Sequence, residues 1–305
     1  MFGITFGSKA FAFAQAFTAC VAALAQDAPR LALEQVPLNS VGTVSSVAMD
    51  RNGVIYLLQR GDKADPVIAV DKEGKTLRSW GKGMFTVPHS VRADPDGNIW
   101  TVDAGSSVIL KFTPQGKKLQ EISVGEMAVG DKCAFPTLCG TTDITFGPNG
   151  RLFISDGYGN ARILEYTSGG KRVKVWGSAG TGPGQFQIPH GIAYQANTLF
   201  VADRGNSRVQ RFDLEGRYLG EWTGLGRPFA LKVAGGALWV STMLTKESQA
   251  KPAILKVDLP TGKVLGQIES PGPHSIDVSE AGEVVASGCC GGSNPNGYSW
   301  FRKTR

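Results

Sequence analysis

Short hydrophobic runs follow one another along most of the chain, and turn residues separate them at regular intervals. The runs are rich in Val, Ile, Leu and aromatic residues, which favour β-strands. The breaks carry Asp-Gly, Asn-Gly and Gly-Lys pairs, which favour tight turns. The 40 glycines among the 305 residues fit the same picture. The pattern therefore predicts an all-β protein.

A set of four such runs recurs with a period of about 45 residues. Two copies show it plainly: HSVRADPDGNIWTVDAGSSVILKFTPQGKKLQEISVG, which starts at His89, and HGIAYQANTLFVADRGNSRVQRFDLEGRYLGEWTG, which starts at His190. Six units of four antiparallel strands predict a six-bladed β-propeller, a single domain over residues 26–305. The last unit has only three clear runs. We therefore expect RLALEQVPL, near the N-terminus, to supply its fourth strand and to close the ring.

The first 25 residues follow a different pattern. Lys9 precedes an apolar run that ends in Ala23-Leu24-Ala25, a cleavage site of the A-x-A type. We expect residues 1–25 to be a signal peptide and the mature chain to be secreted or periplasmic. No later segment has the length of about 20 apolar residues that a membrane span needs, so we expect no membrane contact beyond export.

Four cysteines remain in the mature chain: Cys133, Cys139, Cys289 and Cys290. An oxidising compartment permits disulfides, and four cysteines allow three pairings. The simplest pairing joins Cys133 to Cys139 and Cys289 to Cys290, and the other two stay open. None of the four has the spacing of a zinc finger.

The net charge of +6 comes from basic residues that are scattered through turns such as DKEGK and PQGKK. No basic run is interleaved with aromatic residues, as a nucleic-acid-binding surface would require. We therefore expect no nucleic-acid partner, and we expect the protein to be a monomer that acts on a small molecule or a peptide.

The three histidines of the chain occupy one position in alternate units. They are His89 in unit two, His190 in unit four and His274 in unit six, each directly after a proline. The remaining units carry Ser45, Thr142 and Phe229 there. The first strand of a propeller blade lines the central channel, so the three imidazoles are expected to converge on its axis. Three neutral imidazoles suit zinc and leave one coordination position open, as in catalytic zinc sites.

The turn after the second strand of each unit should reach the same mouth of the channel. These turns carry Arg60 in QRGD, Tyr158 in SDGYGN and Arg204 in ADRGN. Two arginines can hold a carboxylate through forked hydrogen bonds. A tyrosine beside a divalent cation can act as a base, because the cation lowers its pKa.

The stretch GPGQFQIPHGIAYQANTLFVADRGNSRVQRF resembles an NHL-type propeller repeat. Over nearly all of the mature chain, the sequence also resembles the lyase domain of peptidylglycine α-amidating enzymes. That resemblance implies a six-bladed propeller with a catalytic zinc ion held by three histidines. It also implies cleavage of a peptidyl-α-hydroxyglycine into a peptide amide and glyoxylate.

The resemblance extends to individual residues. It implies that the zinc ligands are His89, His190 and His274. It places the catalytic tyrosine of the family at Tyr158, in SDGYGNAR, and its two arginines at Arg60 and Arg204. Tyr158 would take the hydroxyl proton of the substrate, and the arginines would orient the carboxylate.

The chain departs from the family pattern at three points. A structural calcium in the family uses two carbonyls, at Val47 and Val91 here, and an aspartate whose place is taken by Ser275. Calcium is therefore a weaker expectation than zinc. One family disulfide pairs the position of Cys139 with that of Gly159 and a second is absent, so the disulfide scheme must differ. No histidine is left for a partner copper monooxygenase domain, so we expect the hydroxylated substrate to be made elsewhere.

Two other functions fit a propeller of this kind. Many NHL-type propellers are non-catalytic modules that bind partners on one loop face, and a fold does not imply a function. Propeller lactone hydrolases are metal-dependent enzymes that act on another small substrate. Their sites rely on calcium with Asp, Asn or Glu ligands, whereas His, Ser, Thr and Phe occupy the channel positions here. The sequence does not separate a peptide substrate from another small carbinolamide.

Overall fold

The computed structural model describes residues 33–37, 42–125, 139–243, 251–270, 272–288 and 298–303. The expected signal peptide and three of the four cysteines that follow it (Cys133, Cys289 and Cys290) lie outside these ranges.

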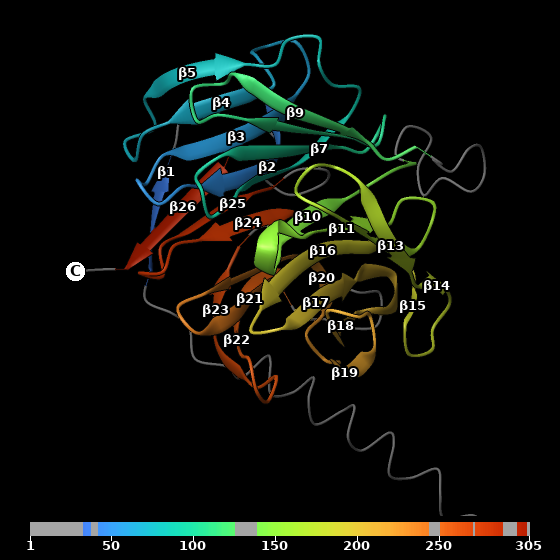
Figure 1. The fold of residues 1–305 in the computed structure, drawn as a ribbon. Helices are drawn as coiled ribbons and strands as arrows, with labels where there is room; N and C mark the ends of the chain where they lie inside the picture. Colours follow the sequence, from blue (N-terminus) through green and yellow to red (C-terminus); the bar gives the residue numbers. More distant parts are fainter. Residues whose placement is uncertain are drawn as a thin grey trace, which may run out of the picture.

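Six four-stranded antiparallel sheets make up the fold (Figure 1). Blade one consists of β2(Thr43–Met49), β3(Ile55–Arg60), β4(Val67–Val70) and β5(Thr76–Trp80). Blade two consists of β6(Pro88–Ala93), β7(Ile99–Asp103), β8(Val108–Phe112) and β9(Lys118–Ser123). Blade three consists of β10(Asp143–Phe146), β11(Leu152–Asp156), β12(Arg162–Tyr166) and β13(Arg172–Trp176).

The second half of the chain repeats this arrangement. Blade four consists of β16(Pro189–Gln195), β17(Thr198–Asp203), β18(Arg208–Asp213) and β19(Tyr218–Trp222). Blade five consists of β20(Arg227–Ala234), β21(Ala237–Met243), β22(Ala253–Asp258) and β23(Val264–Glu269). Blade six consists of β24(Ser275–Val278), β25(Val284–Ser287), β26(Tyr298–Lys303) and β1(Leu33–Pro37). Short parallel strands, β14(Ser178–Ala179) and β15(Gln185–Phe186), and 3-10 turns, η2(Pro148–Gly150) and η3(Arg204–Asn206), complete the described elements.

The first strands of the six blades form a closed ring. Each contacts the first strand of the next blade, and β24 contacts β2. In blade six the N-terminal strand β1 pairs with β26, so the chain closes the ring with a strand from each of its ends. The all-β propeller architecture and its closure by RLALEQVPL are thereby confirmed.

Burial falls from the axis of the ring to its edge. The inner strand β6 is buried at its first five residues, whereas the outer strand β13 is exposed at its first four. Six clusters of buried apolar side chains lie between neighbouring blades. Val91 on β6 and Ile192 on β16, each two residues after a histidine, enter two of these clusters. Ser90 and Arg92, the neighbours of Val91, line the channel cavity instead, because side chains alternate along a strand.

Three tryptophans that end units of the repeat pack against the following blade. The Trp80 ring lies 5.9 Å from the Phe112 ring, and the Trp176 ring lies 4.6 Å from the Phe212 ring. Trp222 lies beneath Gly262, where an added Cβ would approach its ring to 2.5 Å. These contacts stabilise blade–blade packing and place the tryptophans away from the channel.

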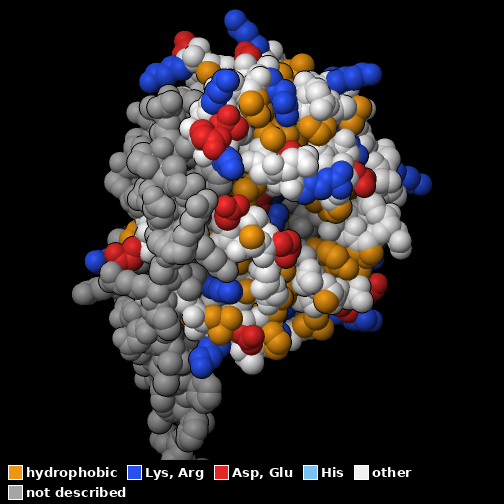
Figure 2. Space-filling view, turned by 90° about the vertical axis from the view of Figure 1, so that its left-hand side faces the viewer, with side chains coloured by type: hydrophobic (Ala, Val, Ile, Leu, Met, Phe, Trp, Pro, Cys, Tyr) orange, Lys and Arg blue, Asp and Glu red, His pale blue; other side chains and the backbone are white. Residues whose placement is uncertain are grey.

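The basic residues are dispersed on the surface. Figure 2 shows Lys and Arg side chains distributed among acidic and apolar ones on one face of the propeller. Within the described ranges, no helix is long and apolar enough to cross a membrane.

Candidate metal centre

The three histidines meet at one end of the channel, as the repeat predicts. His89 lies on β6, His190 lies on β16, and His274 directly precedes β24. Their potential ligand atoms all lie within 4.8 Å of one another, and the three side chains are buried. The ring centroids are 4.9 to 5.1 Å apart. This spacing can hold one metal ion between them.

A break in the strand pairing helps to aim these side chains. In blades two and four the register shifts at the start of the inner strand, between Pro88 and Ser90 and between Pro189 and Ile192. Such a β-bulge bends the strand and can redirect a side chain next to a site. His89 and His190 lie inside these two breaks. The bulges are therefore part of the local structure that turns both imidazoles into the channel.

Each imidazole is oriented by the blade that follows it. The Nδ1 atoms of His89, His190 and His274 lie 2.7, 2.9 and 2.8 Å from three backbone carbonyls. These carbonyls belong to Thr142, Phe229 and Ser45, the residues at the equivalent position of the other three blades. A carbonyl only accepts hydrogen bonds, so each Nδ1 carries the proton and each Nε2 keeps a lone pair. All six blades therefore contribute to the site.

The histidines are held in their neutral form. Burial, the neighbouring histidines and nearby arginines lower the pKa of His89 and His190 well below the ordinary value. Burial, with the charge of Arg60 as a second cause, lowers the pKa of His274 to about 3. Metal binding at neutral pH thus requires no release of protons from these rings.

The metal-free protein is expected to lose stability as the pH falls from about 6.5 toward about 3. The folded histidines stay neutral there, whereas unfolded histidines, with a pKa of about 6.5, take up protons. Urea unfolding of chelator-treated protein at a series of pH values measures this effect. Between pH 6 and 5 the free energy of unfolding of His190→Ala should fall less steeply than that of the unsubstituted chain, by up to about 1.4 kcal/mol per pH unit. Equal slopes would contradict the neutral, buried state of His190.

Tyr158 lies against the histidines from the turn after β11. Its hydroxyl is 2.9 Å from Nε2 of His89 and 3.1 Å from Nε2 of His190. A Cβ at Gly157 would overlap the carbonyl oxygen of Pro189, so only glycine permits this approach of the turn to blade four. Burial raises the pKa of Tyr158, and the charges of two arginines oppose that rise.

Those two arginines are Arg60, the last residue of β3, and Arg204, which directly follows β17. Arg204 hydrogen-bonds to Tyr158 and lies 4.2 Å from the centre of the Phe229 ring, a cation–π contact. The Nε atom of Arg60 donates to the carbonyl of Pro88 at 2.9 Å, directly before the first histidine. Both cations act on the Tyr158 hydroxyl electrostatically. The structure thus brings all six predicted site residues together.

Three features of the site were not predicted from the sequence. These are the orienting carbonyls, the Phe229 ring beneath Arg204, and a buried ion pair of Arg92 with Asp143 farther along the channel. A signal existed for Phe229, which holds the histidine position of blade five. At the position where the family resemblance implies a calcium-binding carboxylate, the Ser275 hydroxyl lies 2.9 Å from that of Ser46.

Known proteins share both the sequence and the fold. The NHL repeat pattern matches residues 186–212. The peptidyl-glycine alpha-amidating monooxygenase of Mus musculus is 33% identical over 203 residues, which make up 56% of this chain and 20% of the mouse protein. The chain therefore spans about a fifth of the length of that relative. A probable peptidyl-alpha-hydroxyglycine alpha-amidating lyase of Caenorhabditis elegans is 27% identical over 263 residues, 74% of each chain.

The resemblance to α-amidating lyases is confirmed. The chain itself carries an NHL repeat on a propeller. Among solved structures, a streptogramin B lyase aligns with a TM-score of 0.61 at 17% identity and covers 90% of this chain and 88% of its own. At that identity the likeness shows the propeller fold alone.

Proposed function

We propose that the protein is a zinc-dependent lyase that cleaves the C–N bond of a peptidyl-α-hydroxyglycine, or of a similar carbinolamide with a free carboxylate. The products would be an amide and glyoxylate. One observation carries the proposal: a single hydroxyl, that of Tyr158, touches two of three converging imidazoles and also meets a guanidinium. Relatives that are named α-amidating lyases support the reaction class.

The donor set fits a zinc ion. Three Nε2 lone pairs point at one space, and the Tyr158 hydroxyl has one proton to share between two of them. In one of its two contacts, therefore, the hydroxyl oxygen faces an Nε2 lone pair with no proton between them. A cation in that space would remove this repulsion between two hydrogen-bond acceptors. Neutral imidazoles are ligands that zinc prefers. A bound zinc ion would supply Lewis-acid stabilisation of negative charge on the substrate's hydroxyl oxygen.

Tyr158 would move the proton in this reaction. With its pKa raised by burial, the side chain is a neutral phenol in the metal-free protein. Positive charge beside it favours the phenolate, which can accept the hydroxyl proton of the carbinolamide. The O–H electron pair then forms the C=O bond of glyoxylate while the C–N bond breaks. The tyrosine can return the proton to the departing amide nitrogen, so the phenolate is restored.

Arg60 and Arg204 would hold the substrate carboxylate. Arg204 is buried and Arg60 is half-buried, so both guanidinium groups lie in a region with little water, and this burial lowers the pKa of both. Charged hydrogen bonds in such a region are strong and fix orientation. The Phe229 ring supports Arg204 from one side, so its planar fork is held in place.

The carboxylate requirement tests the substrate assignment. An N-acyl-α-hydroxyglycine and its methyl ester differ only in that charge. We expect kcat/KM for the ester to be lower by a factor of about 100 or more, because two charged hydrogen bonds contribute about 1.5–3 kcal/mol each. In Arg204→Leu both substrates should react more slowly, because Arg204 also hydrogen-bonds to Tyr158, but kcat/KM should fall further for the acid than for the ester. Equal rates for acid and ester in the unsubstituted protein would contradict the proposed substrate class.

Export and calcium also belong to the proposal. We infer that residues 1–25 direct the chain out of the cytoplasm. Cys139 can keep its disulfide in the oxidising compartment outside it. Its pairing with Cys133 remains a prediction. Calcium has weaker support than zinc, because Ser275 offers a neutral hydroxyl that already hydrogen-bonds to Ser46.

A further inference from the structure

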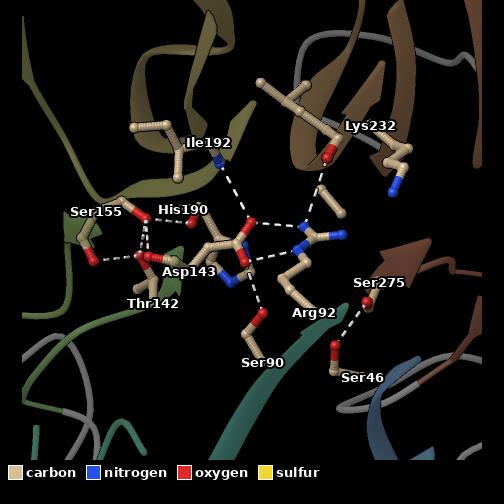
Figure 3. A network of polar contacts seen from close by, with 12 residues as sticks. Ser46, Ser90, Arg92, Thr142, Asp143, Ser155, His190, Ile192, Lys232 and Ser275 are labelled. Atoms are coloured by element: carbon tan, nitrogen blue, oxygen red, sulfur yellow. Dashed lines mark hydrogen bonds and ion pairs between the residues drawn. The ribbon is translucent and has the colours of Figure 1, made fainter. Parts of the chain in front are cut away.

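A second charged cluster lies in the channel next to the three histidines. Arg92 follows His89 by three residues on β6, and it is only 6% exposed. Its side chain lines the same small cavity as the three imidazoles, together with Asp143. Figure 3 shows its guanidinium directed at the Asp143 carboxylate from the neighbouring blade.

The contact between these two residues is forked. Arg92 Nε lies 2.9 Å from Oδ1 of Asp143, and Nη2 lies 2.6 Å from Oδ2. The same carboxylate accepts hydrogen bonds from the Ser90 hydroxyl at 2.6 Å and from the Ile192 amide at 3.2 Å. Ser90 directly follows His89, and Ile192 follows His190 by two residues. Asp143 therefore holds two of the histidine strands from the side.

The remaining guanidinium contacts reach the other side of the channel. Nη1 of Arg92 donates to the carbonyl of Ile276 at 3.1 Å, and Nη2 approaches the carbonyl of Leu231 at 3.5 Å. Ile276 follows His274 by two residues, so the third histidine strand is joined as well. One ion pair thus links β6, β10, β16, β20 and β24.

Nearby carboxylates also stabilise the positive charge of Arg92. Burial by itself lowers the pKa of Arg92, but Asp143 and Asp277 more than offset this effect, so the pKa is raised. Asp143 directly follows Thr142, whose carbonyl orients His89. A shift of Asp143 would therefore reach the imidazole through one peptide unit, as well as through Ser90.

We propose that Arg92 is a positioning residue of the metal centre, and that its pair with Asp143 fixes the three histidine strands at the spacing in which their Nε2 atoms can bind one ion. This inference rests on the proposed metal site and does not depend on the lyase reaction. Residues that orient metal ligands without touching the metal commonly change metal affinity by about 10–100-fold.

Metal affinity, measured by competition with a chromophoric chelator, tests this role. We expect Arg92→Met to bind Zn²⁺ about 10–100-fold more weakly than the unsubstituted chain, and to alter the visible absorption of the bound Co²⁺ ion. Simple electrostatics gives the opposite expectation. Loss of a guanidinium beside an unpaired carboxylate would strengthen cation binding. A weaker affinity is therefore specific to positioning.

Arg92→Met leaves a buried carboxylate unpaired and can fail to fold, so Arg92→Met/Asp143→Asn serves as the second variant. The double variant removes both charges and should also bind Zn²⁺ about 10–100-fold more weakly. Arg151→Met is the matched control, because Arg151 pairs with the buried Glu165 on blade three, away from the channel. It should keep the affinity of the unsubstituted chain.

The outcomes separate this inference from the proposed function. Unchanged or stronger zinc binding in the folded double variant would overturn the positioning role while the metal centre stands. An unsubstituted chain that binds no Zn²⁺ would overturn the metal centre itself, and the positioning role with it.

Discussion

Replacement of His190 by alanine is expected to abolish metal binding and lyase turnover together. The substitution removes one of three buried imidazoles whose Nε2 atoms share a single space, and two imidazoles form an incomplete zinc site. We expect the zinc affinity to fall at least about 100-fold, since even the groups that only orient ligands contribute about 10–100-fold. Glyoxylate release should fall to the uncatalysed rate.

Metal content and activity must be measured on the same folded sample. Thermal unfolding of the variant, followed by circular dichroism, shows whether the propeller remains intact. Elemental analysis after dialysis against excess zinc then gives its occupancy. A folded His190→Ala protein that retains one zinc per chain would remove His190 from the ligand set.

Replacement of Tyr158 by phenylalanine is expected to preserve metal binding and to lower kcat by about 10²–10⁴-fold, the usual contribution of a proton-transfer group. The substitution removes only the hydroxyl group, whose oxygen lies 2.9 Å from Nε2 of His89 and 3.1 Å from Nε2 of His190. KM should change little, because Arg60 and Arg204 are the groups that we propose to bind the carboxylate. Steady-state kinetics of glyoxylate release, with zinc content determined in parallel, measures both quantities.

Tyr194 offers a matched control for this substitution. It lies on β16, the strand of His190, and its hydroxyl contacts Asn197 rather than the metal centre. Tyr194→Phe should keep full activity. A Tyr158→Phe protein with the kcat of the unsubstituted chain would show that another group moves the proton.

The histidine site could be predicted because the repeat gives the chain an internal alignment. His89 and His190 open units of the same pattern, and the first strand of a blade must face the axis. Arg60, Tyr158 and Arg204 follow from the same logic, since turns after second strands return to that end of the ring. The position of these residues within the repeat was enough to predict that they lie close to the histidines.

The supporting parts of the site could not be predicted in this way. Thr142 and Ser45 orient histidines through their backbone carbonyls, and side-chain identity does not reveal that role. The bulges that redirect His89 and His190 depend on pairing register, which periodicity leaves open. Arg92 is a charged residue on an inner strand, and only the three-dimensional structure shows its partner in the next blade.

The most direct test of the central claim combines two readings on the purified protein. Elemental analysis measures metal per chain, and an assay with an N-acyl-α-hydroxyglycine measures glyoxylate and amide. We expect about one zinc per chain and the two products in equal amounts, with activity lost on chelation and restored by Zn²⁺. Bound zinc without product release would contradict the proposed substrate class. A fully folded protein that binds no zinc would contradict the assignment of the three histidines as a metal site, on which the account depends.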